Sequence, residues 1–124
     1  MPELKHVRSV LAVKDLPVSV TFYCEKLGFT IDFEVDGWCF LSRGSFRLML
    51  GSCPDEVPAR QINDHSYFAY IGVSEIDDLH DEFRTRGVAS LRAPENKPWG
   101  MREFMVTTPD GHRMMFGQDL ESVR

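Results

Sequence analysis

The chain has 124 residues, of which 43% are hydrophobic and 27% are charged. This is enough apolar material to bury the core of one ordinary domain, so the composition excludes a disordered protein. The net charge of −5 argues against nucleic-acid binding, which normally requires a basic surface. The sequence has no apolar run of the roughly 18 residues that a membrane span requires, and its three cysteines form no CxxC pair. We therefore expect a soluble, cytoplasmic domain that binds neither nucleic acid nor membrane.

The first half of the chain predicts the element order β-α-β-β-β. Short apolar or alternating runs are typical of strands, and one segment repeats its apolar residues at helical spacing. Asp15 is placed to cap that helix and Gly28 to end it. The predicted elements are a strand over residues 7–13, a helix from Asp15 to Gly28, a strand over residues 29–35, and a hairpin of residues 38–42 and 45–51 with Arg43 and Gly44 at its centre.

The second half repeats this order after a polar stretch that predicts a linker. The predicted elements are a strand over residues 67–73, a helix over residues 74–87, a short strand near residues 88–91, a loop over residues 93–100, and strands over residues 101–107 and 113–116. We therefore expect one α+β domain, residues 1–124, that consists of two tandem βαβββ modules at about residues 5–52 and 66–118, with residues 53–65 as the linker. Pairing two such modules buries their apolar faces and leaves a concave surface between them.

The motifs of the chain resemble a known superfamily. Residues 10–16, VLAVKDL, together with Phe22-Tyr23 and Leu27-Gly28-Phe29, resemble the entry module of the vicinal-oxygen-chelate superfamily, which contains glyoxalase I, extradiol dioxygenases and the bleomycin resistance proteins. Residues 98–104, PWGMREF, and residues 109–112, PDGH, resemble the C-terminal signature of its bleomycin-resistance branch. The resemblance implies that each module forms a half-open barrel, that the modules line a shared cavity, and that two chains form a homodimer, often with exchanged first strands.

The resemblance also defines four positions at which metal-dependent members of the superfamily carry their ligands. In this chain these positions hold Arg8, Met49, Phe68 and Met115. Arginine and phenylalanine do not ligate such metals, and thioethers are poor ligands for Zn²⁺, Ni²⁺ or Fe²⁺. We therefore expect no metal, no other cofactor and no catalytic residues.

Strand alternation predicts which side chains of the first module face the cavity. Arg47 and Met49 point away from the first helix. With the hairpin centred as above, Trp38 lies opposite Met49 and Phe40 lies opposite Arg47. These residues indicate a pocket with aromatic faces and few titrating groups.

The second module adds Phe68 and Tyr70 on one face of its first strand, and Trp99 on a Pro/Gly loop beside the cavity. Aromatic rings and thioethers are typical of a site for a flat ligand, although Met49, Phe68 and Met115 fit the filling of a closed core equally well. The predicted ligand-binding residues are Arg8, Trp38, Phe40, Arg47, Met49, Phe68, Tyr70, Trp99, Arg102 and Met115.

Arg8 requires a partner because a buried guanidinium group loses its hydration. Two explanations stay open from the sequence. Arg8 forms an internal ion pair with a carboxylate such as that of Glu103, or it binds an anionic group of a ligand.

Three functions follow from these observations and the resemblance. The first is a metal-independent protein that binds a small molecule, with drug resistance by sequestration of a bleomycin-type compound. The second is a glyoxalase- or dioxygenase-like enzyme, including a metal-free isomerase or lyase that uses Glu103, His6 or Tyr70 as acid or base. The third is an accessory module that binds a metabolite or a protein, because fold transfers further than function in such superfamilies.

Overall fold

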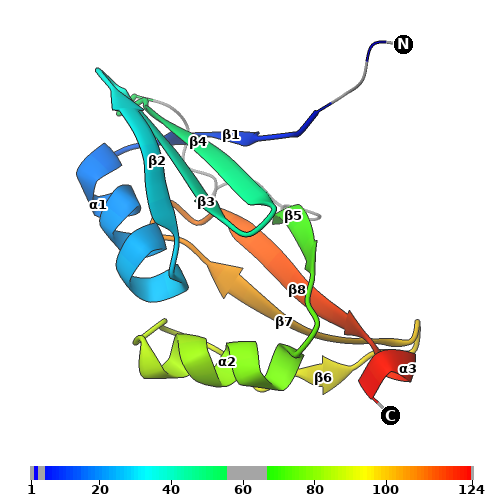
Figure 1. Cartoon of the computed structure of the whole chain (residues 1–124). Helices are drawn as coiled ribbons and strands as arrows, with labels where there is room; N and C mark the ends of the chain where they lie inside the picture. The colour runs from blue at the N-terminus through cyan, green and yellow to red at the C-terminus, as the bar shows by residue number, and fades with distance from the viewer. Residues whose placement is uncertain (1, 3–4, 56–66, 124) are drawn as a thin grey trace.

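The computed structural model describes residues 2, 5–55 and 67–123, which form two four-stranded sheets (Figure 1). The elements are β1 (Ser9–Val13), α1 (Leu16–Thr21), η1 (Phe22–Lys26), β2 (Thr30–Val35), β3 (Trp38–Arg43), β4 (Phe46–Ser52), β5 (Tyr67–Gly72), α2 (Ile76–Thr85), β6 (Glu95–Asn96), β7 (Met101–Thr107), β8 (Arg113–Asp119) and α3 (Leu120–Val123). Among the described residues, no helix is long and apolar enough to cross a membrane.

The two sheets have the same topology. Their strand orders are β1-β4-β3-β2 and β5-β8-β7-β6, and in each sheet the first strand pairs in parallel with the last. We call the part that contains β1–β4 module one and the part that contains β5–β8 module two. Each module has the order βαβββ, which confirms the α+β fold of two such modules. The expected linker lies mostly outside the described residues.

The helix boundaries follow the capping residues. The Asp15 carboxylate accepts a hydrogen bond of 3.2 Å from the backbone N–H of Val18, as a helix N-cap does. Gly28 has φ of +77° and Gly87 has φ of +85°, a left-handed conformation that glycine adopts without strain where a helix ends. The first helix differs from the prediction in one respect. After α1 it continues as a π-helical turn, η1, that the apolar spacing does not reveal.

Two predictions about strands are wrong. The hairpin turn lies at Gly44 and Ser45, so that Arg43 pairs with Phe46 and the register differs by two residues from the expected one. The short strand expected near residues 88–91 is instead a turn in which Ser90 has φ of +60°. The edge strand of module two is β6, which lies inside the expected loop.

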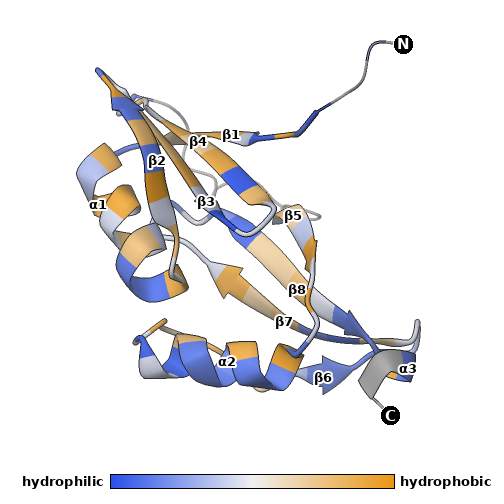
Figure 2. Cartoon of the chain, viewed as in Figure 1, coloured by the Kyte–Doolittle hydropathy of each residue, from blue (hydrophilic) through white to orange (hydrophobic). Residues whose placement is uncertain are grey.

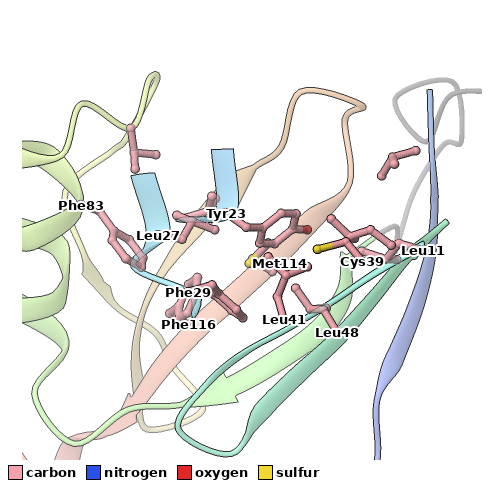
Figure 3. Close-up of a cluster of buried hydrophobic side chains, with 14 of the residues drawn as sticks. Leu11, Tyr23, Leu27, Phe29, Cys39, Leu41, Leu48, Phe83, Met114 and Phe116 are labelled. Atoms are coloured by element: carbon pink, nitrogen blue, oxygen red, sulfur yellow. The ribbon is translucent and has the colours of Figure 1, made fainter. Parts of the chain in front are cut away.

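A single hydrophobic core joins the modules. Leu27 and Phe29 of module one lie in the same buried cluster as Phe83 and Phe116 of module two (Figure 3). The Phe83 and Phe116 rings meet edge to face, with centroids 5.4 Å apart. Since the helix-side residues of both sheets are buried in this core, the opposite face of each sheet points outward, and apolar residues run along the strands of both sheets (Figure 2).

Candidate functional site

The outer face of module one carries an exposed aromatic surface. Phe40 pairs with Met49 across the β3–β4 ladder, and Trp38 pairs with Gly51. The Trp38 ring covers Gly51 so closely that a Cβ there would lie 2.9 Å from the ring. Phe33, on β2, is 56% exposed and meets Phe40 edge to face at 5.7 Å. The two-residue change of register leaves every side chain on its predicted face, because strand alternation has a period of two.

Arg8 is bound within its own module. Its Nη2 donates to Asp32 Oδ2 at 3.3 Å, and its Nη1 donates to the carbonyl oxygens of Leu41 and Leu48 at 3.2 and 3.0 Å. The guanidinium group also lies 5.2 Å from the centre of the Phe40 ring. An internal ion pair was one of the two expected explanations, but the predicted partner was wrong: the carboxylate is that of Asp32.

Asp32 reaches Arg8 because β2 contains a β-bulge between Ile31 and Phe33. The Asp32 carboxylate accepts hydrogen bonds from Arg8 and from the Ser42 hydroxyl, the latter at 3.0 Å. Regular alternation over residues 29–35 contains no signal for this irregularity, which explains why the sequence did not identify the partner.

A cavity of about 440 Å³ lies where the two modules meet. It brings together Arg47 of module one with Phe68 and Tyr70 of module two, three of the predicted residues. Phe68 sits at a bulge in β5, so it has no ladder partner, and it packs against the core and edge to face with His112, at 6.0 Å between ring centroids. The expectation that Phe68 and Tyr70 alternate regularly on one face is therefore wrong.

A second cavity, of about 310 Å³, lies on the outer face of module two. Its lining consists of Tyr67, Tyr70, Lys97, Trp99, Glu103 and Met115. Tyr70 pairs with Met115 across the β5–β8 ladder, as alternation predicts. A Cβ at Gly117 would collide with the Tyr70 hydroxyl, so the glycine makes room for the tyrosine.

Glu103 is the centre of this cavity. Only 5% of the residue is exposed, and its Oε2 accepts hydrogen bonds from the Tyr70 hydroxyl at 2.7 Å and from the Trp99 indole N–H at 2.9 Å. Burial and the bond to the Glu103 carboxylate raise the pKa of Tyr70 well above its usual range, so the tyrosine stays a hydrogen-bond donor. Trp99 is held by this bond although it is 65% exposed.

Arg102 does not reach the other predicted residues. Its guanidinium group donates to the Asp77 carboxylate on α2 at 2.9 Å and to the Asn96 side chain at 2.9 Å. The hydrogen bond from Arg102 is the main reason why the pKa of Asp77 is lowered. The neighbouring Phe104 is buried in the core, which places the even-numbered residues of β7 on the helix side.

Trp38 of module one does not line the cavity around Trp99. The cavity around Trp99 is lined by module two alone, whereas Trp38, Phe40 and Met49 belong to the sheet of module one. In Figure 1, β3 lies near the top of the molecule and β6 near the bottom. Phe33 and Tyr67, which lie beside bulges and are absent from the predicted ligand-binding residues, extend these faces. Glu103, which the sequence offered as a partner of Arg8 or as an acid or base, lines the cavity of module two.

The four positions implied as metal ligands do not fit a metal. The Arg8 cation is bonded to Asp32 and two carbonyl groups, while Met49 and Met115 offer only thioethers and Phe68 a hydrocarbon ring. Among residues 5–55 and 67–121, no three His, Cys, Asp or Glu side chains gather where they could hold a metal ion.

The chain is similar to proteins of known identity. Residues 3–116 match the family described as the Glyoxalase/Bleomycin resistance protein/Dioxygenase superfamily. The chain is 30% identical to a bleomycin resistance protein of Geobacillus stearothermophilus over 90% of this chain and 95% of that protein. It is 28% identical to the glutathione transferase FosA of Serratia marcescens, over 92% and 79%. A bleomycin-binding protein from Streptomyces verticillus, solved as a complex with copper(II)-bleomycin, superposes with a TM-score of 0.73 at 27% identity, over 94% of this chain and 97% of that one.

Proposed function

Because this chain belongs to the glyoxalase/bleomycin resistance protein/dioxygenase superfamily, we propose that it is a metal-independent protein that binds and sequesters a small-molecule drug of the bleomycin type. Sequestration requires a surface that holds the drug and no bond-making step. The similarity to the Geobacillus and Streptomyces proteins supports this ligand class.

The observation that carries the proposal is a set of exposed aromatic side chains on β2, on β3 and in the turn between β6 and β7. Trp99 is held by the bond to Glu103 with most of its indole surface open to solvent, and Phe33 and Trp38 are exposed on module one. Exposed aromatic surface that is fixed in orientation is suited to stacking on the planar rings of a ligand.

A second copy of the chain completes the site in our proposal. Each outer face alone covers one side of a planar ligand, and each exposes large apolar side chains, Phe33 and Trp38 on module one and Tyr67 and Trp99 on module two. A two-fold homodimer that places module one of one chain against module two of its partner creates two identical grooves. Each groove then takes Trp38 from one chain and Trp99 from the other.

We assign the protein to the cytoplasm on the basis of its cysteines. Cys24, Cys39 and Cys53 are all free thiols, and Cys39 is buried in the core. Unpaired cysteines are usual in a reducing compartment.

Titration of the purified protein with metal-free bleomycin tests the proposed function, with tryptophan fluorescence as the signal and EDTA present throughout. We expect saturable quenching at micromolar or lower concentration, about one drug molecule per chain, and recovery of the drug chemically unchanged. A flat titration would contradict the proposal. Loss of the parent drug during incubation would identify an enzyme instead.

A further inference from the structure

We propose that the cavity around Glu103 binds an alkylammonium group, so that this part of the site selects ligands with a small organic cation. The inference deepens the proposed function, because the cavity lies on the outer face of module two. It concerns Glu103, which neither the predicted site nor the proposed stacking surface includes.

Glu103 is a buried carboxylate with a bond still to make. Both of its hydrogen bonds fall on Oε2, from the neutral donors Tyr70 and Trp99. Among the described residues no cation pairs with Glu103, and its Oε1 accepts no hydrogen bond. Both donors are neutral groups, so the two hydrogen bonds place no positive charge beside the carboxylate. Its Oε1 is accessible from the cavity, where a cation can bind it.

The walls of the cavity suit an organic cation. Tyr67, Tyr70 and Trp99 supply aromatic rings, whose faces attract ammonium groups, and Met115 adds an apolar thioether. Lys97 is the other formally charged residue in the lining, and its ammonium group is bound to Glu95 at 2.8 Å. The volume of about 310 Å³ accommodates a small amine or one terminal group of a larger ligand.

Module one contains the same arrangement with its cation in place. There Asp32 is the carboxylate, Phe40 is the aromatic ring, and Arg8 is the cation that lies between them, 3.3 Å from the carboxylate and 5.2 Å from the ring centre. In module two the carboxylate of Glu103 and the rings of Tyr70 and Trp99 are present, and the chain supplies no side-chain cation to them among the described residues. The ligand therefore supplies it.

The test follows the Trp99 indole N–H by NMR in ¹⁵N-labelled protein. The chain has two tryptophans, so Trp38→Phe assigns both indole signals. Benzylammonium and benzyl alcohol are the probes, since they share a ring and differ in charge. We expect a saturable shift of the Trp99 signal with benzylammonium, and binding about tenfold or more weaker with benzyl alcohol, because the alcohol can still donate a hydrogen bond to the carboxylate but carries no positive charge.

Two variants locate the effect. Glu103→Gln keeps acceptors for Tyr70 and Trp99, and we expect it to weaken benzylammonium binding about tenfold or more. Glu34→Gln makes the same charge change at an exposed position of β2 and should leave binding unaltered. If Glu103→Gln does not fold, the affinities of the wild-type protein for benzylammonium and benzyl alcohol are sufficient to test the inference.

Equal binding of the alcohol, preferential binding of benzoate, or an unaltered affinity in Glu103→Gln would overturn the inference. The proposed function can fail separately. Benzylammonium binding without bleomycin binding would support the cation site and contradict bleomycin as the ligand. Bleomycin binding with no response to benzylammonium would support the proposed function and contradict the cation site.

Discussion

Arg8 and Glu103 show how single charged residues are accommodated on the two sheets. Arg8 finds its carboxylate, two carbonyl groups and an aromatic ring within module one. Glu103 finds two neutral donors in module two. Arg8 is therefore part of the structure, whereas we propose that Glu103 binds a ligand.

Replacing Arg8 tests this distinction. Arg8→Met removes the bonds to Asp32 and to the carbonyl groups of Leu41 and Leu48, so we expect the free energy of unfolding to fall by about 1–2 kcal/mol. Urea unfolding at a fixed protein concentration measures the change. Arg84→Met is the matched control, because the exposed Arg84–Asp81 pair should contribute less than about 0.5 kcal/mol. An Arg8→Met protein as stable as the wild type would show that Arg8 is not a structural residue.

Trp99 should behave in the opposite way. Since most of its surface is open to solvent, we expect Trp99→Ala to change the free energy of unfolding by less than about 1 kcal/mol. The same change should weaken bleomycin binding about tenfold or more, through the loss of a stacking surface. Calorimetric titration and thermal unfolding of the same samples separate the two effects. A large loss of stability with intact binding would place Trp99 in the core.

At the scale of elements, the contact between β3 and α2 ties the modules together. Arg43 donates to both carboxylate oxygens of Glu82, at 2.7 and 2.9 Å, and to the carbonyl group of Leu27 at 2.9 Å. Glu82 also receives a bond of 2.8 Å from Arg86. The hydrogen bond from Arg43, followed by that from Arg86, lowers the pKa of Glu82 below its ordinary value of 4.5.

The lowered pKa sets a pH dependence for this contact. A carboxyl group whose pKa is lower in the folded than in the unfolded state stabilises the fold above the unfolded value, and loses that effect as the pH falls through the folded value. Glu82→Gln should therefore be less stable than the wild type at neutral pH, by about 0.5–1 kcal/mol, because the pair is about one-third exposed. The difference should shrink as the pH falls below 4.5. Urea unfolding across this range measures it, and a pH-independent difference would contradict the role of the pair.

The same elements show what alternation predicts and what it does not. Met49, Tyr70 and Met115 lie on the sheet face that points away from the helices, as alternation predicts. For Met49 this holds because a register change of two residues preserves the face. Alternation fails at the two β-bulges, where Asp32 and Phe68 are extra residues without a partner in the ladder. Such an extra residue is recognised only from the pairing with the neighbouring strand.

The partners of Arg102 and Glu103 could not be predicted from a single strand, because they come from segments that are distant in the sequence. The ion pair of Arg102 with Asp77 joins β7 to α2, and no local pattern connects them. Arg102 is two residues from the buried Phe104 on β7, so alternation along the strand places both side chains on the helix side of the sheet. The hydrogen bonds that Tyr70 and Trp99 donate to Glu103 join three segments that only the folded sheet brings together.

For the whole molecule, one core unites the modules and leaves two apolar faces outside. Asp110, in the turn before β8, accepts hydrogen bonds from the backbone N–H of Lys14 and the hydroxyl of Ser19, and so adds a buried polar contact between the modules. Within the part of the chain that the structure describes, aromatic side chains of the outer faces such as Phe33 and Trp99 stay exposed. Exposed faces of this kind favour the association of two chains.

We expect the wild-type chain to sediment as a dimer in analytical ultracentrifugation. A charge on the outer face of module one should oppose association, because Phe33 is exposed and its loss does not disturb the core. Phe33→Asp should therefore shift the protein towards monomer. Val18→Asp is the control, because Val18 is similarly exposed but lies on α1, on the helix side of the sheet. A monomeric wild type would contradict the shared site.

Complementation between two variants tests the shared site most directly. Co-expression of a Trp38→Ala chain with a differently tagged Trp99→Ala chain yields a mixed dimer that can be purified on both tags. If each groove takes Trp38 from one chain and Trp99 from the other, one groove of the mixed dimer is intact and the other lacks both tryptophans. We expect the mixed dimer to bind one bleomycin per dimer with wild-type affinity, while each pure variant binds weakly. Weak binding by the mixed dimer at both grooves would show that the site lies within one chain.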